Sequence, residues 1–349
     1  MSVETTCAVV GLGSMGSQHA AILANLPIAD LAICCDTDPD SEGRCPPGVP
    51  FTTELADVLS QPNLKAVVVA TPDDSHCQVV VNLLERGLHV LCEKPIAIKL
   101  DDADLMIRAE ASSAGRLTIG HVVRFDPRYL AVRDAVWSGR LGSAVHITTR
   151  RNCSVIYGRR LSATTTLPMY LSVHDLDLME WIMRSQIVRV YAEGATSSDF
   201  GNGMAASVVA TLRFANGAVG THEVSWALPE AAGLDSGDFG LSYVGTGGAA
   251  YVDLRSQGVS IYGGVEVNNA DQCSRGHVEH PGMARMIDGM PVGNVRSELE
   301  HFLMTVDGHF RPMTTGDEGR RALKVALALE KALTTGAVVN VVQGEGESS

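Results

Sequence analysis

Hydrophobic and polar residues follow two different patterns along the chain. In the first third, short runs of consecutive apolar residues alternate with stretches in which apolar residues recur at helical spacing. The predicted strands are residues 8–10, 31–35, 66–70, 89–92 and 117–120, and the predicted helices between them are residues 17–26, 53–60, 76–86 and 101–113. Continuously apolar strands are typical of a parallel sheet covered on both faces, so this part is expected to be an α/β domain.

After residue 124 the pattern changes. Helices are predicted at 127–138 and 172–184 with a polar segment between them, and alternation then predicts an antiparallel sheet in which Asn216-Gly217 is a hairpin turn. The predicted strands are residues 188–196, 205–214, 220–227, 240–244, 250–254 and 259–262. Residues 263–294 are predicted to be long loops, followed by helices at 295–307 and 317–335.

The length of 349 residues favours two domains over one. We predict an N-terminal dinucleotide-binding domain at 1–122 and an α+β domain with an open, mainly antiparallel sheet at 123–349. The helix at 317–335 is the element expected to be able to pack back on the first domain.

Composition and charge exclude several classes of partner. The net charge of −13 would repel nucleic acid and anionic lipid. The chain shows neither a basic leader nor an apolar run that could cross a bilayer, and we expect a cytoplasmic protein without a membrane partner. Its eight cysteines form no C-x-x-C pair, so reduced thiols and no metal site are expected.

A glycine-rich turn follows the first predicted strand and opens the first helix. Its residues are Gly11, Leu12, Gly13, Ser14, Met15 and Gly16. Gly11 suits a tight turn, Gly13 allows close approach of a pyrophosphate, and Gly16 allows the helix to pack closely on the sheet. Asp36 ends the second strand, where a carboxylate accepts hydrogen bonds from the adenosine ribose and repels the extra phosphate of NADP. The pattern predicts NAD as cofactor, and the alternative is that Asp36 is only a turn residue.

Two further signals lie at later strand ends, where open parallel sheets bind ligands. Thr71-Pro72 follows one strand, with His76 at the start of the next helix. Glu93-Lys94-Pro95 follows the next strand. Both segments are expected to border the nicotinamide end of the cofactor.

Taken together, these motifs resemble the glucose-fructose oxidoreductase/inositol dehydrogenase (Gfo/Idh/MocA) family. The similarity covers nearly the whole chain. It includes the glycine turn with His19, Ala70-Thr71-Pro72 with His76, residues 87–95, residues 120–127, and His174-Asp175-Leu176-Asp177. The resemblance implies a Rossmann domain, an open sheet that often mediates oligomerisation, and a substrate site that both domains form.

The resemblance also implies catalytic residues. In that family the lysine of Glu-Lys-Pro lies beside the reacting carbon, and an Asp-x-x-x-His motif supplies the proton-transfer partners. Lys94 and His174 match, whereas Tyr170 replaces the aspartate. Lys94 suits stabilisation of an alkoxide, and His174 suits a general base because its ordinary pKa is close to neutral. Tyr170 is a substitute acid/base or a pocket wall.

Other residues have weaker assignments. His121, Arg124 and Asp177 are candidates for the substrate pocket, while His19 and Asp175 are left as structural. Lys94 and His174 also have structural alternatives, as a solvated lysine and a hydrogen-bonded helix histidine.

The leading hypothesis is an NAD-dependent dehydrogenase or ketoreductase that acts on a secondary alcohol or ketone carbon of a cyclitol, sugar, nucleotide sugar or aminoglycoside-type glycoside. The partners expected are this small molecule and further copies of the chain, as a homodimer or homotetramer. A redox-neutral NAD-dependent glycosidase and a non-catalytic NAD-responsive regulatory protein are the alternatives.

Overall fold

The computed structural model divides into two compact units. It describes residues 5–197, 199–200, 204–229, 237–255, 258–263, 275–278, 286–287, 290–291 and 293–341. The first unit comprises Met1–Phe125 and Met283–Leu323, and the second comprises Asp126–Gly282 and Lys324–Ser349. Most of the predicted loops at 263–294 and the polar C-terminus after residue 341 lie outside the described residues.

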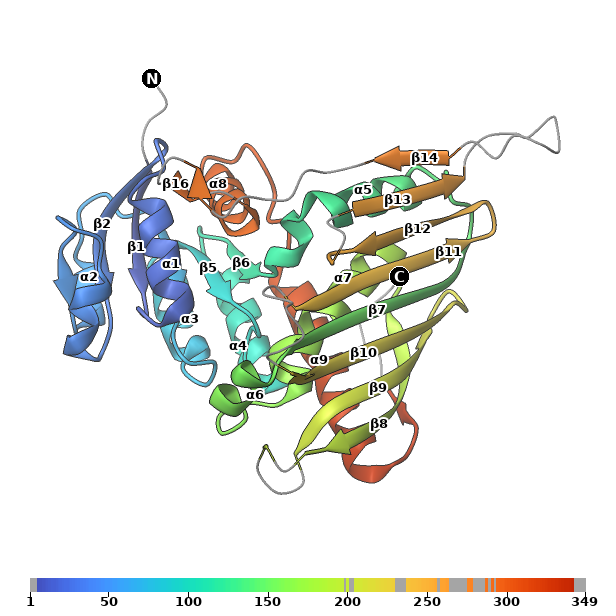
Figure 1. Cartoon of the computed structure of the whole chain (residues 1–349). Helices are drawn as coiled ribbons and strands as arrows, with labels where there is room; N and C mark the ends of the chain where they lie inside the picture. Colours follow the sequence, from blue (N-terminus) through green and yellow to red (C-terminus); the bar gives the residue numbers. More distant parts are fainter. Residues whose placement is uncertain are drawn as a thin grey trace. The chain divides into compact units, whose positions relative to one another are not determined.

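The first unit contains a six-stranded parallel sheet in the order β3-β2-β1-β4-β5-β6. Its strands are β1 (Thr5–Val10), β2 (Ala29–Cys35), β3 (Phe51–Thr52), β4 (Ala66–Val69), β5 (His89–Glu93) and β6 (Leu117–Gly120). Its helices are α1 (Ser14–Leu23), η1 (Pro39–Arg44), α2 (Leu55–Leu59), α3 (His76–Glu85), α4 (Leu100–Ala111), η2 (Val122–Phe125) and α8 (Asn294–Val306), and the short strands β15 (Met286–Ile287) and β16 (Met290–Pro291) pair with each other. Figure 1 shows the helices packed around these strands. The strand order reverses between β1 and β4, which is where a doubly wound sheet binds its ligand.

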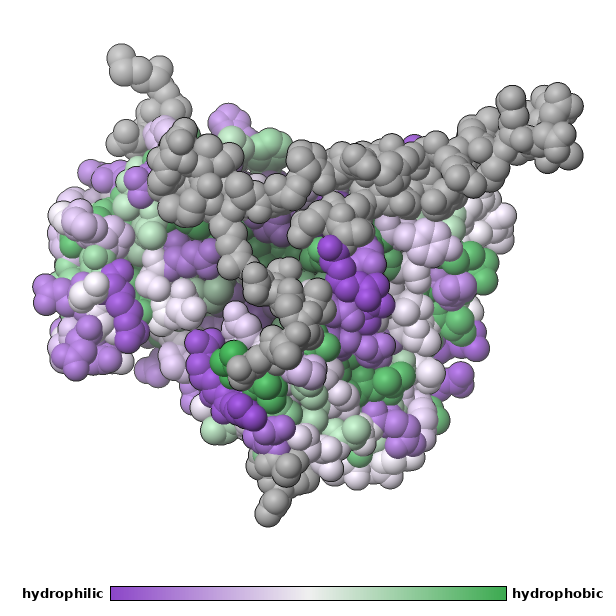
Figure 2. All heavy atoms as spheres, viewed as in Figure 1, coloured by the Kyte–Doolittle hydropathy of each residue, from purple (hydrophilic) through white to green (hydrophobic). Residues whose placement is uncertain are grey.

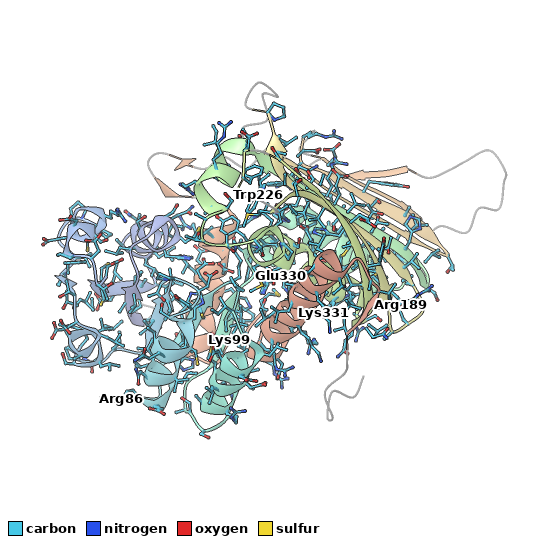
Figure 3. All side chains as sticks on the ribbon, turned by 90° about the horizontal axis from the view of Figure 1, so that it is seen from below. Arg86, Lys99, Arg189, Trp226, Glu330 and Lys331 are labelled. Atoms are coloured by element: carbon cyan, nitrogen blue, oxygen red, sulfur yellow. The ribbon has the colours of Figure 1, made fainter. Side chains whose placement is uncertain are left out.

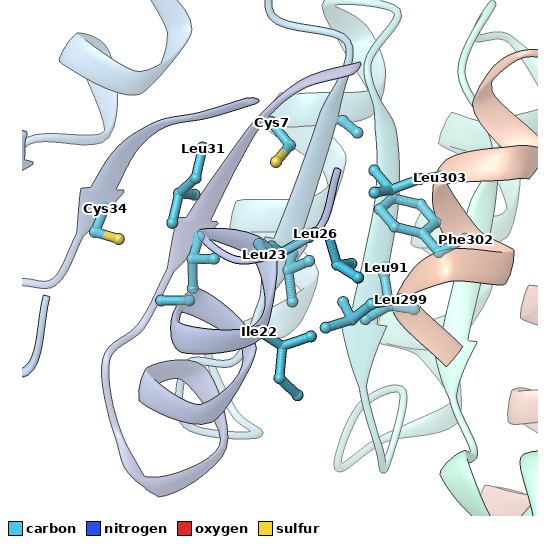
Figure 4. Packing of buried hydrophobic residues seen from close by; sticks show 14 of the residues in the cluster. Cys7, Ile22, Leu23, Leu26, Leu31, Cys34, Leu91, Leu299, Phe302 and Leu303 are labelled. Atoms are coloured by element: carbon cyan, nitrogen blue, oxygen red, sulfur yellow. The ribbon is translucent and has the colours of Figure 1, made fainter. Parts of the chain in front are cut away.

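The core of the first unit joins segments that are far apart in sequence. Leu299, Phe302 and Leu303 of α8 belong to the same buried cluster as Leu23 of α1 and Leu91 of β5 (Figure 4). The cluster explains why α8 belongs with the Rossmann sheet, although the domain boundaries predicted from the sequence place residues 123–349 in the second domain.

The second unit is built on a nine-stranded sheet in the order β14-β13-β12-β11-β7-β10-β9-β8-β17. Its strands are β7 (Ala144–Ser154), β8 (Ile187–Thr196), β9 (Ala205–Phe214), β10 (Val219–Leu228), β11 (Asp238–Gly245), β12 (Gly248–Asp253), β13 (Gly258–Gly263), β14 (Arg275–Val278) and β17 (Val339–Asn340). Its helices are α5 (Pro127–Trp137), α6 (Val155–Leu161), the π-helical turn η3 (Pro168–Ser172) and α7 (Val173–Met183), and α9 (Gly316–Thr335) runs from the first unit into the second. In Figure 1 the strands lie in front and α7 lies behind them. The predicted antiparallel sheet is confirmed, except that β7 and β10 pair in parallel.

The structure corrects two parts of the sequence reading. The segment predicted as polar and irregular contains β7, a strand of 11 residues near the middle of the sheet. Its inward side chains include Thr149 and Arg151, which are polar but buried with partners. The strand therefore lacks the alternation of apolar and polar residues by which a strand is recognised in a sequence. The region predicted as long loops includes the strands β14, β15 and β16.

Candidate active site

The three glycines of the turn in the first unit differ in the space around them, and only Gly13 has space for an added side-chain atom. Gly11 has φ +90°, and a Cβ there would lie 2.5 Å from the Ala70 carbonyl oxygen. A Cβ on Gly16 would lie 1.7 Å from the Gly11 carbonyl oxygen, so α1 packs directly on the turn. A Cβ on Gly13, in contrast, would meet no heavy atom within 4 Å. The side of Gly13 is therefore open at a helix N-terminus, as a pyrophosphate site requires.

Asp36 is tied to the same turn. Its Oδ2 accepts the backbone N–H of Leu12 at 2.6 Å, and its Oδ1 accepts the N–H of Asp38 at 2.9 Å. Arg44 donates to the Leu12 carbonyl oxygen at 3.1 Å. Ser14 is exposed, and Asp36 and Met15 are half-buried. This half-buried carboxylate, fixed beside the open turn, fits the ribose end of NAD.

The turns after β4 and β5 are joined by a buried histidine. His76 Nε2 lies 3.0 Å from the Thr71 carbonyl oxygen, and Nδ1 lies 3.0 Å from the Pro95 carbonyl oxygen. Ser75 adds a hydrogen bond to Thr71 Oγ1 at 2.8 Å. His76 is fully buried, so it acts here by holding Thr71 and the Lys94–Pro95 segment together.

Glu93 anchors the backbone of Lys94. Its Oε1 accepts a hydrogen bond from His19 Nε2 at 2.7 Å, and its Oε2 accepts the N–H of Lys94 at 3.2 Å. Burial raises the pKa of Glu93, but the hydrogen bond and charge of His19, with Lys94, outweigh it and leave the pKa lowered. Lys94 itself is half-buried at the C-terminal edge of the sheet. His19 thus supports this site, in addition to its place in the core.

Two carboxyl groups near this turn have no assignment from the sequence. Asp73 is half-buried, and burial raises its pKa although His76 and Lys94 oppose the change. Glu298 on α8 is 1% exposed, and among the described residues neither of its carboxyl oxygens has a hydrogen-bond partner. Burial and the charge of Glu93 raise the pKa of Glu298 well above its usual range. Asp73 could have been found from its position after a predicted strand, whereas nothing local distinguishes Glu298.

Tyr170 and His174 lie one turn apart in the second unit. Tyr170 is in η3 and His174 is in the first turn of α7, and both are half-buried. The backbone N–H of Tyr170 donates to the Thr166 carbonyl at 2.9 Å, and the hydroxyl of Thr166 donates to Glu330 of α9, labelled in Figure 3. Asp177 is buried on α7.

A buried ion pair fixes the start of α7. Arg151 Nε and Nη2 donate to Asp175 Oδ2 and Oδ1 at 2.5 and 3.1 Å, and the ring of Phe239 lies 4.8 Å from the guanidinium carbon. Asp175 follows His174 directly. This bidentate pair therefore limits the movement of the helix turn that carries His174.

The remaining pocket candidates are in the first unit. Arg124 is buried and donates to Glu318 at 2.9 Å and to the Met313 carbonyl at 2.7 Å, contacts that secure the start of α9. His121 is buried directly after β6. Contact of either residue with a substrate stays a prediction.

The structure thus gathers the expected cofactor residues with Lys94 in one unit, and Tyr170, His174 and Asp177 in the other. That these two groups meet around one substrate also stays a prediction. Within the described ranges, no three His, Cys, Asp or Glu side chains are placed to hold a metal ion. The helices described include none that is long and apolar enough to span a bilayer.

Comparison with known proteins gives consistent matches over both units. The family described as "Oxidoreductase family, NAD-binding Rossmann fold" matches residues 5–121, and the GFO/IDH/MocA C-terminal domain matches residues 129–251. Myo-inositol 2-dehydrogenase of Thermotoga maritima is 27% identical over 335 residues, 93% of this chain and 95% of that protein. The uncharacterized oxidoreductase YrbE of Bacillus subtilis is 25% identical over 355 residues, 99% of both chains. The structure of levoglucosan dehydrogenase with NADH and L-sorbose shares the fold, with a TM-score of 0.82, 17% identity, and coverage of 97% of this chain and 99% of that one.

Proposed function

Because the chain belongs to the GFO/IDH/MocA oxidoreductase family with an NAD-binding Rossmann fold, we propose that it is a sugar or cyclitol dehydrogenase or ketoreductase. The substrate class includes cyclitols, sugars, nucleotide sugars and aminoglycoside-type glycosides that carry a secondary alcohol or ketone. One observation supports this proposal most. The open side of Gly13 and the carboxylate of Asp36 lie at the same edge of the sheet as the end of β5, which Lys94 directly follows. The relative named myo-inositol 2-dehydrogenase supports a polyol substrate.

The proposed chemistry divides between cofactor and side chains. NAD⁺, when bound, supplies the acceptor for the hydride of the substrate carbon. The chain must remove the hydroxyl proton and stabilise the developing negative charge on oxygen. We assign stabilisation of this charge to Lys94, because Lys94 directly follows β5 at the edge of the sheet from which the glycine turn also leaves. We assign proton transfer to His174 with Tyr170. His121, Arg124 and Asp177 are proposed to shape the substrate pocket.

A substrate screen tests this proposal. Cyclitols, sugars, nucleotide sugars and amino-sugar glycosides are incubated with NAD⁺, and the oxidised carbon is identified by NMR. The expected result is NADH that accumulates in step with product. Lys94→Ala and His174→Ala should each lower kcat by about 10²-fold or more while NADH still binds. Turnover of a glycoside without net NADH would instead identify a redox-neutral glycosidase, and NADH binding without turnover of any compound would identify a regulatory protein.

The proposed enzyme is a homodimer or homotetramer that associates through the second unit. The outer face of its sheet carries the exposed side chains Val209, Val219 and Tyr251, on β9, β10 and β12. Hydrophobic residues lie among polar ones on the strand side of this unit in Figure 2. Self-association is a common way to cover such a face. Light scattering should give a dimer or larger particle, and a monomer at working concentration would contradict this part of the proposal.

A further inference from the structure

Asp73 lies in a closed turn next to the turn of Lys94. β4 and β5 are neighbouring parallel strands, with Val69 opposite Cys92, so the segments that follow them leave the same edge of the sheet. His76 connects these segments through its 3.0 Å contacts to the carbonyl oxygens of Thr71 and Pro95. Asp73 stands between Thr71 and His76 in the chain, and the contacts of His76 therefore hold it close to Lys94.

The cations that act on the Asp73 carboxyl are, in order of strength, His76 and Lys94. The ionisable groups that act on Asp73 are His76, Lys94, Asp74 and Glu93. Both ring nitrogens of His76 already face carbonyl oxygens, and Glu93 is engaged by His19. Lys94 is half-buried and Asp73 is half-buried, so the attraction between them is screened less than at an open surface.

We propose that Asp73 is a positioning residue for Lys94, whose ammonium group it holds at the sheet edge in its charged form. The proposal rests on the catalytic role proposed for Lys94. The residues assigned to the reaction so far, Lys94, His174 and Tyr170, include no carboxylate, and Asp73 supplies one from the first unit. Burial raises the pKa of Asp73, and the charge of Lys94 opposes this rise, as expected for a cation close to the carboxyl group.

The proton balance follows from these roles. The hydroxyl proton of the substrate is transferred to His174 with Tyr170, and the ammonium group of Lys94 stabilises the negative charge that develops on the oxygen. The Asp73 carboxylate favours the charged form of Lys94, so Lys94 neither gains nor loses a proton in this step. NAD⁺, when bound, would supply the hydride acceptor.

Competitive labelling of lysines tests the pairing without any substrate. The protein is treated with limiting acetic anhydride over a range of pH, and acetylation of Lys94 is measured by mass spectrometry. Asp73→Asn should move the labelling curve of Lys94 about one pH unit lower, since loss of a nearby opposite charge favours the neutral amine. The matched control is Asp74→Asn, which removes the adjacent exposed carboxylate and should leave the curve unchanged. A labelling curve for Asp73→Asn that superimposes on the wild-type curve overturns the proposal.

Two additions separate this role from a purely structural one. Asp73→Glu keeps the charge and should restore the wild-type labelling curve, and Asp73→Ser gives a second neutral variant if Asp73→Asn does not fold. With an active substrate, Asp73→Asn should lower kcat more than it raises KM, with a pH profile displaced in the same direction as the labelling. If Lys94→Ala leaves turnover intact while the labelling shift is present, the proposed function fails and the pairing stands. If the labelling does not respond, the pairing fails and the proposed function stands.

Discussion

His19 and Glu93 are buried together, with Nε2 of the imidazole 2.7 Å from Oε1 of the carboxylate. The contact joins α1, which begins in the glycine turn, to β5, which ends at Lys94. The cofactor turn and the proposed catalytic lysine are therefore linked by one hydrogen bond in the interior of the first unit.

Loss of the contact between His19 and Glu93 should lower the stability of the folded state. His19→Ala leaves the buried carboxylate of Glu93 without its side-chain partner and should lower the free energy of unfolding by about 3 kcal/mol at neutral pH. His19→Gln retains an N–H donor and should lose less. Denaturant unfolding of both variants measures the difference, and equal stability of His19→Ala and the wild type would exclude the buried pair.

Glu298 should make the folded state less stable as the pH rises above the usual carboxyl pKa. The folded state keeps this carboxyl protonated because its pKa is raised, whereas the unfolded chain releases the proton above the usual carboxyl pKa. Rising pH therefore removes stability, by at most about 1.4 kcal/mol per pH unit, until Glu298 ionises in the folded state. Glu298→Gln should remove this dependence, so that its stability relative to the wild type increases from pH 5 to pH 8. Glu300→Gln, on the same helix, is the control and should show no such trend.

Two glycine substitutions should separate binding from folding. Gly13 has φ −64° and open space at its Cβ position, so Gly13→Ala should keep the wild-type unfolding free energy within about 0.5 kcal/mol. The added methyl group occupies the proposed pyrophosphate position and should weaken NADH at least about 10-fold. Gly16→Ala places a methyl group against the Gly11 carbonyl and should cost about 2 kcal/mol or more in stability. Fluorescence titration and chemical unfolding give both quantities, and unchanged NADH affinity in Gly13→Ala would place the pyrophosphate elsewhere.

The charge of Asp36 should determine cofactor preference. Asp36→Asn keeps a side-chain oxygen for the Leu12 N–H but removes the charge, so NADH should bind about 10-fold more weakly while NADPH loses little or gains. Asp38→Asn removes a nearby exposed charge and should affect both cofactors little. Equal losses of NADH and NADPH in Asp36→Asn would contradict the ribose assignment.

The hydroxyl of Tyr170 should take part in proton transfer. Tyr170→Phe keeps the ring, so packing around η3 is retained, and kcat should fall by about 10²-fold with an altered pH profile. The measurement is steady-state kinetics on a substrate from the screen, with circular dichroism as the control for folding. A near-normal kcat would leave Tyr170 as a pocket wall and the chemistry with Lys94 and His174.

The sequence by itself determined the features that depend on local patterns. The apolar runs of β1, β4 and β5, the glycine turn and the carboxylate of Asp36 each follow from residues that are neighbours in the chain. A strand buried on both faces and a turn that requires Gly11 leave a periodic or compositional mark, because the constraint acts within a few residues.

Only the tertiary structure decided which polar residues become buried partners. The sequence pattern did not reveal strand β7 because the inward-facing residue Arg151 is polar, and the partner of Arg151, Asp175, is 24 residues away. His19 is 74 residues from Glu93. Glu298 comes from α8, which shares a buried cluster with Leu91 of β5 although residues 126–282 of the second unit lie between them in sequence. Such pairs depend on which elements pack together, and burial of a charge leaves no periodic signal in the chain. The positions of Asp73 and Lys94 lie between these cases: the sequence places each at a strand end, and the sheet makes those ends neighbours.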